Sequence, residues 1–406
     1  MSCRLCKSND LTLFLDLGHT ALADRFMRVE QLIEPEITYP LRVVRCNSCF
    51  FCQLDHAVDP KILYQEDYPY ESSTTQTGRT HFSNFAKSIV ERFSIEKGKL
   101  VIDIGSNVGV LLNGFKQQGM QVLGVDPAEN IAEIANKNGI PTETDFFNAD
   151  LARRVVRDRG QAMVITASNV FAHVDRLDLF MDSIITLLDK DGVFVVEAPY
   201  LANLIKALEY DTIYHEHLSY LSIMPLIPFF SKMGMELFDV QQVDIHGGSF
   251  RLFICHKGKY PVSNAVLELH AKEQADGLHD LDVLNKFAKG VAEHRSKLRY
   301  LLEALRHDGK KIAGVSAPAK GMTLLNYCNI GRETLEFITE KTHLKIGRYS
   351  PGSAIPILPD SALVTENIDY ALLLAWNFKD EIIKNQKEFR ERGGKFIIPI
   401  PVPTII

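Results

Sequence analysis

Val101-Ile-Asp-Ile-Gly-Ser-Asn-Val-Gly109 determines the fold class, because it combines an apolar strand, a glycine turn and the start of a helix. Asp103 ends the strand. Gly105 and Gly109 keep the turn free of side chains, so a ligand can lie against the backbone at the carboxyl end of a sheet. The stretch therefore predicts an open α/β fold with a ligand site at this turn.

The alternation of strands and helices continues beyond the turn and predicts a parallel sheet with crossover helices. Two extended runs, 238–245 and 249–256, then predict an antiparallel pair that closes the sheet. Such an ending fits a methyltransferase domain better than a dinucleotide-binding one. The elements expected before that pair are strands at 100–104, 122–125, 163–167 and 193–197 and helices at 108–118, 131–138 and 180–188.

The glycine turn has the spacing Asp-x-Gly-x-x-x-Gly rather than Gly-x-Gly-x-x-Gly, which counts against NAD and FAD. Asp126 ends the second strand, where a carboxylate can accept both ribose hydroxyls of an adenosine. Asp145-Phe-Phe147 follows at the place where adenine would stack. These features favour S-adenosylmethionine (SAM); the alternative is the glycine turn of another nucleotide fold. The cofactor-binding residues that we predict are Asp103, Gly105, Ser106, Asn107, Gly109, Asp126, Pro127, Asp145, Phe146, Phe147, Asn169, Val170 and His173.

Asn169-Val-Phe-Ala-His173 follows the strand at 163–167, and a polar pair at that point would face the methyl-transfer centre. Asn169 on its own could instead cap a helix. We include both polar residues in the predicted site.

Two cysteine pairs, Cys3-Arg-Leu-Cys6 and Cys46-Asn-Ser-Cys49, frame the N-terminal region. Their two-residue spacing lets both sulfurs of a pair reach one metal, which predicts a structural, tetrahedral Zn²⁺ site. Disulfides are the alternative, but the N-terminus shows no secretory signal and cytosolic thiols stay reduced. Cys52 is a surplus thiol that we expect to be a small buried residue, although the site could shift onto it.

Length and charge set further limits. The 406 residues allow two or three domains, and we expect a zinc-binding domain at 1–57, the SAM domain at 58–262 and a smaller α/β domain at 263–406. The net charge of −6 gives no electrostatic footprint for nucleic acid or anionic membrane, and no apolar stretch is long enough to cross a bilayer. We expect a cytoplasmic monomer that binds neither.

Tyr214-His-Glu-His217 is the densest titratable cluster of the chain. It fits a second metal site or a general base that a neighbouring carboxylate orients, and we favour the base. On a strand, His215 and His217 would share a face. The segments Glu197–Tyr200 and His246–Arg251 could approach the same centre; for the second, a Gly-Gly hairpin with a surface arginine is the alternative.

The C-terminal region contains Ser316-Ala-Pro-Ala-Lys-Gly321 between a predicted strand and a predicted helix. Small residues, a lysine and a helix N-terminus make a phosphate cradle, and Lys345 and Arg348 add two cations. A negatively charged, nucleotide-linked substrate would explain a second Rossmann-like domain of this kind. Scattered surface lysines are the alternative.

With these motifs the chain resembles the sugar C-methyltransferases of nucleotide-linked deoxyhexose pathways, which make branched-chain sugars. The resemblance covers nearly the whole chain. It implies a class I SAM-dependent methyltransferase domain between a zinc-binding domain and a second Rossmann-like domain. Besides the cysteine pairs and the turn at 101–109, it rests on Tyr68-Pro-Tyr70-Glu-Ser-Ser, Asn169–His173, Glu197-Ala-Pro, Tyr214–His217, His246–Arg251, Ala317-Pro-Ala-Lys-Gly321 and Ala375-Trp-Asn-Phe378.

The resemblance also implies roles for individual residues. His217 would be the base, and Lys320 and its neighbours would contact the nucleotide diphosphate. The sugar contacts that it implies are Tyr214, Glu216, Asn169 and a tyrosine of the pair Tyr68 and Tyr70. The substrate-binding residues that we predict are Tyr200, His246, Ser249, Arg251, Pro318, Ala319, Lys320, Asn326, Lys345 and Arg348.

One departure concerns the nucleotide. Where the family tends to have Asp-x-x-x-x-Lys-Gln-Gly, this chain has Glu340-Lys-Thr-His-Leu-Lys-Ile346-Gly. Ile346 removes a polar side chain there, so the identity of the nucleotide base stays open.

The reaction that we predict is C-methylation next to a ketone. A 4-keto sugar has acidified C–H bonds at C3 and C5, so His217 can remove a proton and leave an enolate carbon that attacks the SAM methyl group. Donors near Tyr214 or Asn169 would hold the enolate oxygen. The rivals are an N- or O-methyltransferase on a related nucleotide sugar, a zinc-knuckle binding protein with a degenerate fold, and a nicotinamide oxidoreductase.

Overall fold

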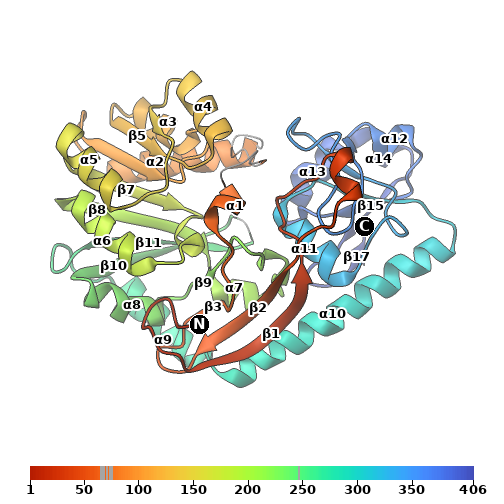
Figure 1. The fold of residues 1–406 in the computed structure, drawn as a ribbon, viewed down its shortest axis with the longest axis horizontal. Helices are drawn as coiled ribbons and strands as arrows, with labels where there is room; N and C mark the ends of the chain where they lie inside the picture. Colours follow the sequence, from red (N-terminus) through yellow and green to blue (C-terminus); the bar gives the residue numbers. More distant parts are fainter. Residues whose placement is uncertain (65–68, 70–71, 73–75, 246) are drawn as a thin grey trace.

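The structure, a computed structural model, describes residues 1–64, 69, 72, 76–245 and 247–406. The predicted contacts Tyr68, Tyr70 and His246 lie outside these residues. The described chain forms three sheets, of four, seven and six strands. Figure 1 shows the seven-stranded and the six-stranded sheets in separate bodies, with strand β1 (Leu11–Thr20) at the bottom between them and the long helix α10 (Leu281–His307) running below the six-stranded sheet.

The middle sheet has the predicted strand–helix alternation. Its order is β10-β11-β8-β7-β4-β5-β6, with β4 to β8 parallel and β11 and β10 antiparallel at one edge, as expected. All five residues of β4 are buried, because helices cover both faces of a parallel sheet. The strands are β4 (Leu100–Ile104), β5 (Gln121–Val125), β6 (Thr142–Glu143), β7 (Ala162–Ser168), β8 (Leu188–Pro199), β10 (Met235–Val243) and β11 (Ser249–His256).

Helices precede the sheet, cross between its strands and follow it. They are α1 (Pro60–Tyr64), α2 (Gln76–Arg92), α3 (Val110–Gln117), α4 (Glu129–Lys137), α5 (Ala149–Arg159), η2 (Phe171–His173), α6 (Leu177–Leu187), α7 (Leu201–Lys206), η3 (Tyr210–Thr212), α8 (Ile223–Lys232) and α9 (Asn264–Ala275). Among the described residues, no helix combines the length and the apolarity that a membrane span needs.

The C-terminal sheet is a second, mostly parallel sheet in the order β14-β13-β12-β15-β16-β17. Only β17 runs antiparallel to its neighbour. Its strands are β12 (Ile312–Val315), β13 (Ile338–Glu340), β14 (Ile357–Pro359), β15 (Tyr370–Leu373), β16 (Lys395–Ile398) and β17 (Thr404–Ile405). Its helices are α11 (Ala319–Cys328), α12 (Ala362–Thr365), η4 (Trp376–Phe378), α13 (Lys379–Asn385) and α14 (Lys387–Glu391).

The N-terminal sheet is completed by the middle of the chain. Besides β1 it contains β2 (Tyr39–Cys46), β3 (Cys52–Leu54) and β9 (Ser219–Tyr220), with the helix η1 (Val29–Ile33) between β1 and β2. Strand β9 belongs to the segment 58–262, which was expected to form only the SAM domain. The first two expected domains are therefore interleaved, because β3 pairs with β9.

Helix α9 falls in the segment 263–406, which was expected to form the C-terminal domain, but it packs on the middle domain. Its Glu273 is buried and accepts hydrogen bonds from Tyr200 Oη and from the backbone N–H groups of Ile223 and Met224. A carboxylate at the start of a helix is stabilised by the N–H groups there. Glu273 thus fixes α9 to the N-terminus of α8.

A buried ion pair fixes the antiparallel edge of the middle sheet. Glu197 on β8 lies 2.6 Å from Arg251 Nη2 on β11 and 2.6 Å from His81 Nε2 on α2. The guanidinium also lies 3.6 Å from the centre of the Phe85 ring. Burial opposes ionisation of Glu197, but the hydrogen bond from His81 and the charge of Arg251 outweigh it and hold the pKa of Glu197 below its usual range.

We expect Arg251→Met to lower the free energy of unfolding by about 3–5 kcal/mol, because it leaves the Glu197 carboxylate buried without its cation. Denaturant unfolding measures this change. Arg306→Met, which breaks the partly exposed pair with Glu336, is the control and should cost at most about 1 kcal/mol. Equal losses in both variants would contradict a buried pair.

Candidate functional site

The four predicted zinc ligands come together. The Sγ atoms of Cys3, Cys6, Cys46 and Cys49 all lie within 4.8 Å of one another. Two of the sulfur–sulfur distances are 3.5 Å, near the edge of about 3.8 Å expected for a tetrahedron of thiolates around zinc. Cys52 is fully buried outside this cluster, so the donor set fits a closed structural Zn²⁺ site without it.

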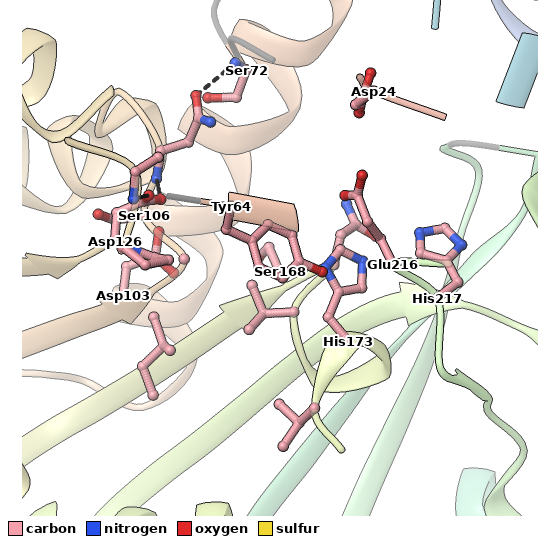
Figure 2. A pocket seen from close by; sticks show the side chains of 18 of the residues that line it. Asp24, Tyr64, Ser72, Asp103, Ser106, Asp126, Ser168, His173, Glu216 and His217 are labelled. Carbon is pink, nitrogen blue, oxygen red and sulfur yellow. Dashed lines mark hydrogen bonds between the residues drawn. The ribbon is translucent and has the colours of Figure 1, made fainter. Parts of the chain in front are cut away.

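The second site is a cavity of about 1220 Å³ at the carboxyl ends of both parallel sheets. Residues from all three parts of the chain line it. Figure 2 shows Asp103, Ser106 and Asp126 at one end and His173, Glu216 and His217 at the other, with Tyr64 and Ser168 between them. The predicted residues that line the cavity are Asp103, Gly105, Ser106, Asn107, Asp126, Pro127, Asp145, Phe146, Phe147, Asn169, Val170, His173, Tyr214, Glu216, His217, Pro318, Ala319, Lys320 and Lys345.

The glycine turn has the geometry that its sequence predicts. Gly105 has φ of +65°, and a Cβ atom there would lie 2.3 Å from Val170 Cγ2. Gly109 has φ of +81° and immediately precedes helix α3. Side chains at these two positions would be strained or would clash, so the backbone stays open to a ligand.

Asp126 holds the turn and still has room for a ligand. Its carboxylate accepts one hydrogen bond from Asn107 N (2.8 Å) and one from Ala128 N (3.0 Å). Two oxygens can accept about four hydrogen bonds, so the remaining positions suit two ribose hydroxyls. Burial raises the pKa of Asp126, and it raises the pKa of Asp103 to about 7.

Three buried polar atoms of the cavity wall indicate which kind of ligand the cavity suits. Ser106 Oγ, Ser168 Oγ and His173 Nε2 have no hydrogen-bond partner among the described residues. Buried polar groups are costly unless a hydrogen bond satisfies them. Together with the open turn and Asp126, they fit a cofactor with ribose and charged groups, as SAM has.

At the other end, His217 is held in one tautomer. Its Nδ1 lies 2.7 Å from the carbonyl oxygen of Thr212, which can only accept a hydrogen bond. Nδ1 therefore carries the proton, and Nε2 carries the lone pair that a base needs. The ring centre of Tyr214 lies 4.0 Å from that of His217, and the ring centre of His173 lies 4.9 Å from it.

His215 faces away from this cluster. The segment 214–217 is a turn and not a strand, so His215 and His217 do not share a face. His215 is buried, with Nε2 3.3 Å from the carbonyl oxygen of Tyr39 on β2, and burial lowers its pKa to about 4. It does not line the cavity.

Asn169 directly follows β7 and has φ of +57°, and its N–H donates to the carbonyl oxygen of Glu197 (2.7 Å). The residue that precedes η2 is Val170, so Asn169 does not cap that helix. The alternative reading as a helix cap is thereby excluded, and Asn169 faces the cavity.

Tyr64 and Asp24 are among the lining residues that the sequence analysis did not predict. Tyr64 ends α1, and its ring stacks at 6° on His173, with 6.1 Å between ring centres. Burial raises the pKa of Tyr64 well above its usual value, and the charges of Glu216 and Asp24 add to the effect. Asp24 reaches the cavity from the N-terminal domain. Neither lies in a spacing motif, and only tertiary packing brings them here.

The C-terminal domain contributes two lysines. Lys320 Nζ lies 3.7 Å from Asp211 Oδ2, 3.3 Å from Asn377 Oδ1 and 4.0 Å from the centre of the Trp376 ring. These contacts hold a cation at the N-terminus of α11.

Lys345 is buried at the junction of two domains. Its Nζ donates to the carbonyl oxygen of Ala317 (2.8 Å) and lies 3.4 Å from Asp24 Oδ1. Lys345 therefore joins the loop before α11 to the N-terminal domain.

Six predicted residues do not line the cavity in the part of the chain that the structure describes: Gly109, Tyr200, Ser249, Arg251, Asn326 and Arg348. For most of the substrate set, an internal contact explains why. Tyr200 Oη donates to Glu273, and Ser249 Oγ donates to the carbonyl oxygen of Ile245. Arg251 forms the buried pair with Glu197, so it is not a surface arginine either. Asn326 Nδ2 donates to two backbone carbonyl groups.

The chain matches three known domain families. Residues 3–64 match a zinc binding domain, residues 79–238 a methyltransferase domain and residues 244–401 the C-methyltransferase C-terminal domain. C-methyltransferase NovU of Streptomyces niveus is 37% identical over 405 residues, which are 100% of this chain and 96% of that protein. The ubiquinone biosynthesis O-methyltransferase of Rhodopseudomonas palustris is 29% identical over 119 residues, 28% of this chain and 44% of that protein.

Solved structures match a smaller part of the chain. The magnesium protoporphyrin IX methyltransferase (ChlM) of Synechocystis PCC 6803, with bound SAH, covers 46% of this chain and 89% of its own at 16% identity, with a TM-score of 0.35. A S-adenosylmethionine-dependent methyltransferase of Clostridium acetobutylicum covers 44% and 92% at 9% identity, with a TM-score of 0.35.

We expect Asp126→Ala to weaken SAM binding by about 1–3 kcal/mol, because ribose hydroxyls lose a charged acceptor. Calorimetry measures the affinity. Glu129→Ala removes an exposed carboxylate from the first turn of α4 and should leave it unchanged. Unchanged affinity in Asp126→Ala would refute this placement of the ribose.

We expect Cys46→Ser to lose zinc and to destabilise the N-terminal sheet, because the metal joins the segment before β1 to the turn between β2 and β3. SAM affinity should change little. Metal analysis should find about one zinc per chain in the wild type and in Cys52→Ser, which alters a thiol outside the cluster. Purified wild-type protein without zinc would contradict this assignment.

Proposed function

The chain belongs to a family of SAM-dependent C-methyltransferases that carry an N-terminal zinc-binding domain, and from that premise we propose that its substrate is a nucleotide-linked 4-keto-deoxy sugar. The methyl group would go to a carbon next to the ketone. The product would be a branched-chain sugar. One observation carries this proposal: a histidine held in the basic tautomer lies in a cavity that the cofactor turn and the C-terminal lysines share.

The chemistry begins at His217. Nε2 of the neutral imidazole takes the proton from a carbon next to the carbonyl group, and the C–H electron pair becomes an enolate. SAM, when bound, would supply an electrophilic methyl group. The enolate carbon would form the new C–C bond while the S–CH₃ bond breaks, and S-adenosylhomocysteine would leave. The proton is removed from a carbon before the methyl transfer, and this step separates the reaction from methylation of an oxygen or a nitrogen.

The developing negative charge on the enolate oxygen needs hydrogen-bond donors close by. Tyr214 and Asn169 line this part of the cavity. Tyr64 joins them, because its raised pKa keeps the phenol protonated and able to donate. Glu216 is buried beside these rings, where a carboxylate can orient a sugar hydroxyl.

The part of the cavity that the C-terminal domain lines suits the nucleotide. A volume of about 1220 Å³ exceeds the roughly 300–1,000 Å³ of a pocket for one small molecule, so SAM and a second ligand fit together. Lys320 and the N-terminus of α11 can bind a diphosphate there.

Methylation of nitrogen or oxygen on a related sugar is the rival. Deuterium washout discriminates between them, because only the enolate route exchanges the proton on the sugar carbon without SAM. A panel of UDP- and dTDP-linked 4-keto-6-deoxy sugars, followed by mass spectrometry, would identify the substrate.

We expect His217→Asn to lose about 10²–10⁴-fold in turnover while SAM affinity is retained, because the general base is removed. The proposal further predicts that deuterium washout from the sugar carbon without SAM is lost in the same variant.

The rival base is His173, and His173→Asn is the matched comparison. Washout at the wild-type rate in His217→Asn, together with its loss in His173→Asn, would assign the base to His173 instead. Calorimetry with SAM confirms that each variant still folds and binds its cofactor.

A further inference from the structure

Arg4 joins the zinc-binding knuckle to the part of the chain that carries His217. It lies between the predicted ligands Cys3 and Cys6 and is only 3% exposed. Its Nη1 donates to the carbonyl oxygens of Leu54 (2.7 Å) and Leu218 (3.3 Å). Its own N–H donates to Gln53 Oε1 (2.8 Å). The side chain thus crosses from the knuckle into the middle domain.

Leu218 directly follows His217, and its carbonyl group is held twice. Besides Arg4, the N–H of Leu54 donates to it (2.9 Å), and the pairing of β3 with β9 continues from this point. The backbone on the C-terminal side of the His217 turn is therefore attached to the N-terminal sheet. On the other side of the turn, Thr212 accepts the hydrogen bond from His217 Nδ1.

Arg4 also reaches the segment of the second histidine. Its Nε donates to Asp175 Oδ1 (3.0 Å), two residues after His173, and Asp175 lines the cavity. One guanidinium therefore contacts the segments of both histidines. The rings of His173 and His217 are 4.9 Å apart, so their relative placement depends on where these two segments lie.

We propose that Arg4 is a positioning residue: it aligns the His217 turn and the His173 segment on the zinc knuckle, so that His217 Nε2 meets the substrate carbon. This inference rests on the proposed role of His217 as the base. A planar guanidinium fixes several acceptors at set angles, which the flexible ammonium of lysine cannot do. Displacement of a reacting group by about 1 Å can cost about a hundredfold in rate.

Lys7 offers a matched control on the same knuckle. It forms an ion pair with Asp178 on α6 (3.1 Å), so it also crosses from the knuckle to the middle domain. Asp178 does not line the cavity, and no described contact joins Lys7 to the segment of either histidine. Lys7 Nζ also donates to the backbone carbonyl oxygen of Arg4 (3.2 Å), but no described contact joins it to the Arg4 guanidinium. Lys7→Met therefore removes a knuckle cation and leaves the guanidinium contacts of Arg4 in place.

The test compares Arg4→Met, Arg4→Lys and Lys7→Met with the wild type. We expect both Arg4 variants to keep about one zinc per chain and a SAM affinity within about twofold of the wild type. Turnover and deuterium washout without SAM should fall about tenfold to a hundredfold, more in Arg4→Met than in Arg4→Lys, while KM changes little. Lys7→Met should match the wild type in every measurement.

Nitrogen NMR of ¹⁵N-histidine-labelled protein gives a readout that needs no substrate. In the wild type and in Lys7→Met, the His217 signals, assigned by their loss in His217→Asn, should show protonated Nδ1 and unprotonated Nε2. In Arg4→Met they should show a mixture of tautomers, because the bond to Thr212 is no longer aligned.

Two outcomes overturn the inference. If the Arg4 variants keep wild-type washout and the wild-type tautomer, Arg4 does not position His217. If both Arg4 variants lose zinc or SAM binding, Arg4 serves only stability. The proposed role of His217 fails separately. If His217→Asn keeps the wild-type rate of deuterium washout, His217 is not the base, whatever the Arg4 variants do.

Discussion

The hydrogen bond from His217 Nδ1 to the carbonyl oxygen of Thr212 is the contact on which the chemistry that we propose for the cavity depends. A carbonyl oxygen accepts and never donates, so the bond leaves the lone pair on Nε2. A histidine in solution divides its proton between both nitrogens. Here the fold selects one tautomer before any substrate arrives, which is a form of preorganisation.

The three sheets of the structure place or support the residues that line the cavity around this imidazole. The middle sheet places Asp126 and the glycine turn on the cavity wall, and the C-terminal sheet places Lys320 there as well. The N-terminal sheet supports the turn that carries His217 through β9 and Arg4. The zinc cluster therefore stabilises a sheet that is continuous with the segment of His217, although it lies outside the cavity.

Local motifs were predictable from sequence, and non-local pairings were not. Gly105 and Gly109 indicate an open turn because only glycine adopts their backbone angles at no steric cost, and the structure confirms this. Strand β9 has two residues and no pattern of its own, since it exists only through its pairing with β3. The middle and N-terminal domains therefore looked separable in sequence.

The side-chain roles divide in the same way. Arg251 was expected near the substrate as part of the segment His246–Arg251, but Glu197 is buried beside it and requires a cation. Spacing cannot show such a pairing across strands. His215 and His217 differ by two positions, and a strand was the reason to place them on one face. The chain turns at this point instead, so one ring faces the cavity and the other faces Tyr39.

The most direct test of the proposed reaction is to incubate the wild-type enzyme with a nucleotide-linked 4-keto-6-deoxy sugar in D₂O, first without and then with SAM. The account predicts that one carbon next to the ketone takes up deuterium without SAM, and that the same carbon carries the methyl group afterwards. A sugar that stays fully protonated until SAM is added, or a methyl group found on oxygen or nitrogen, would contradict it.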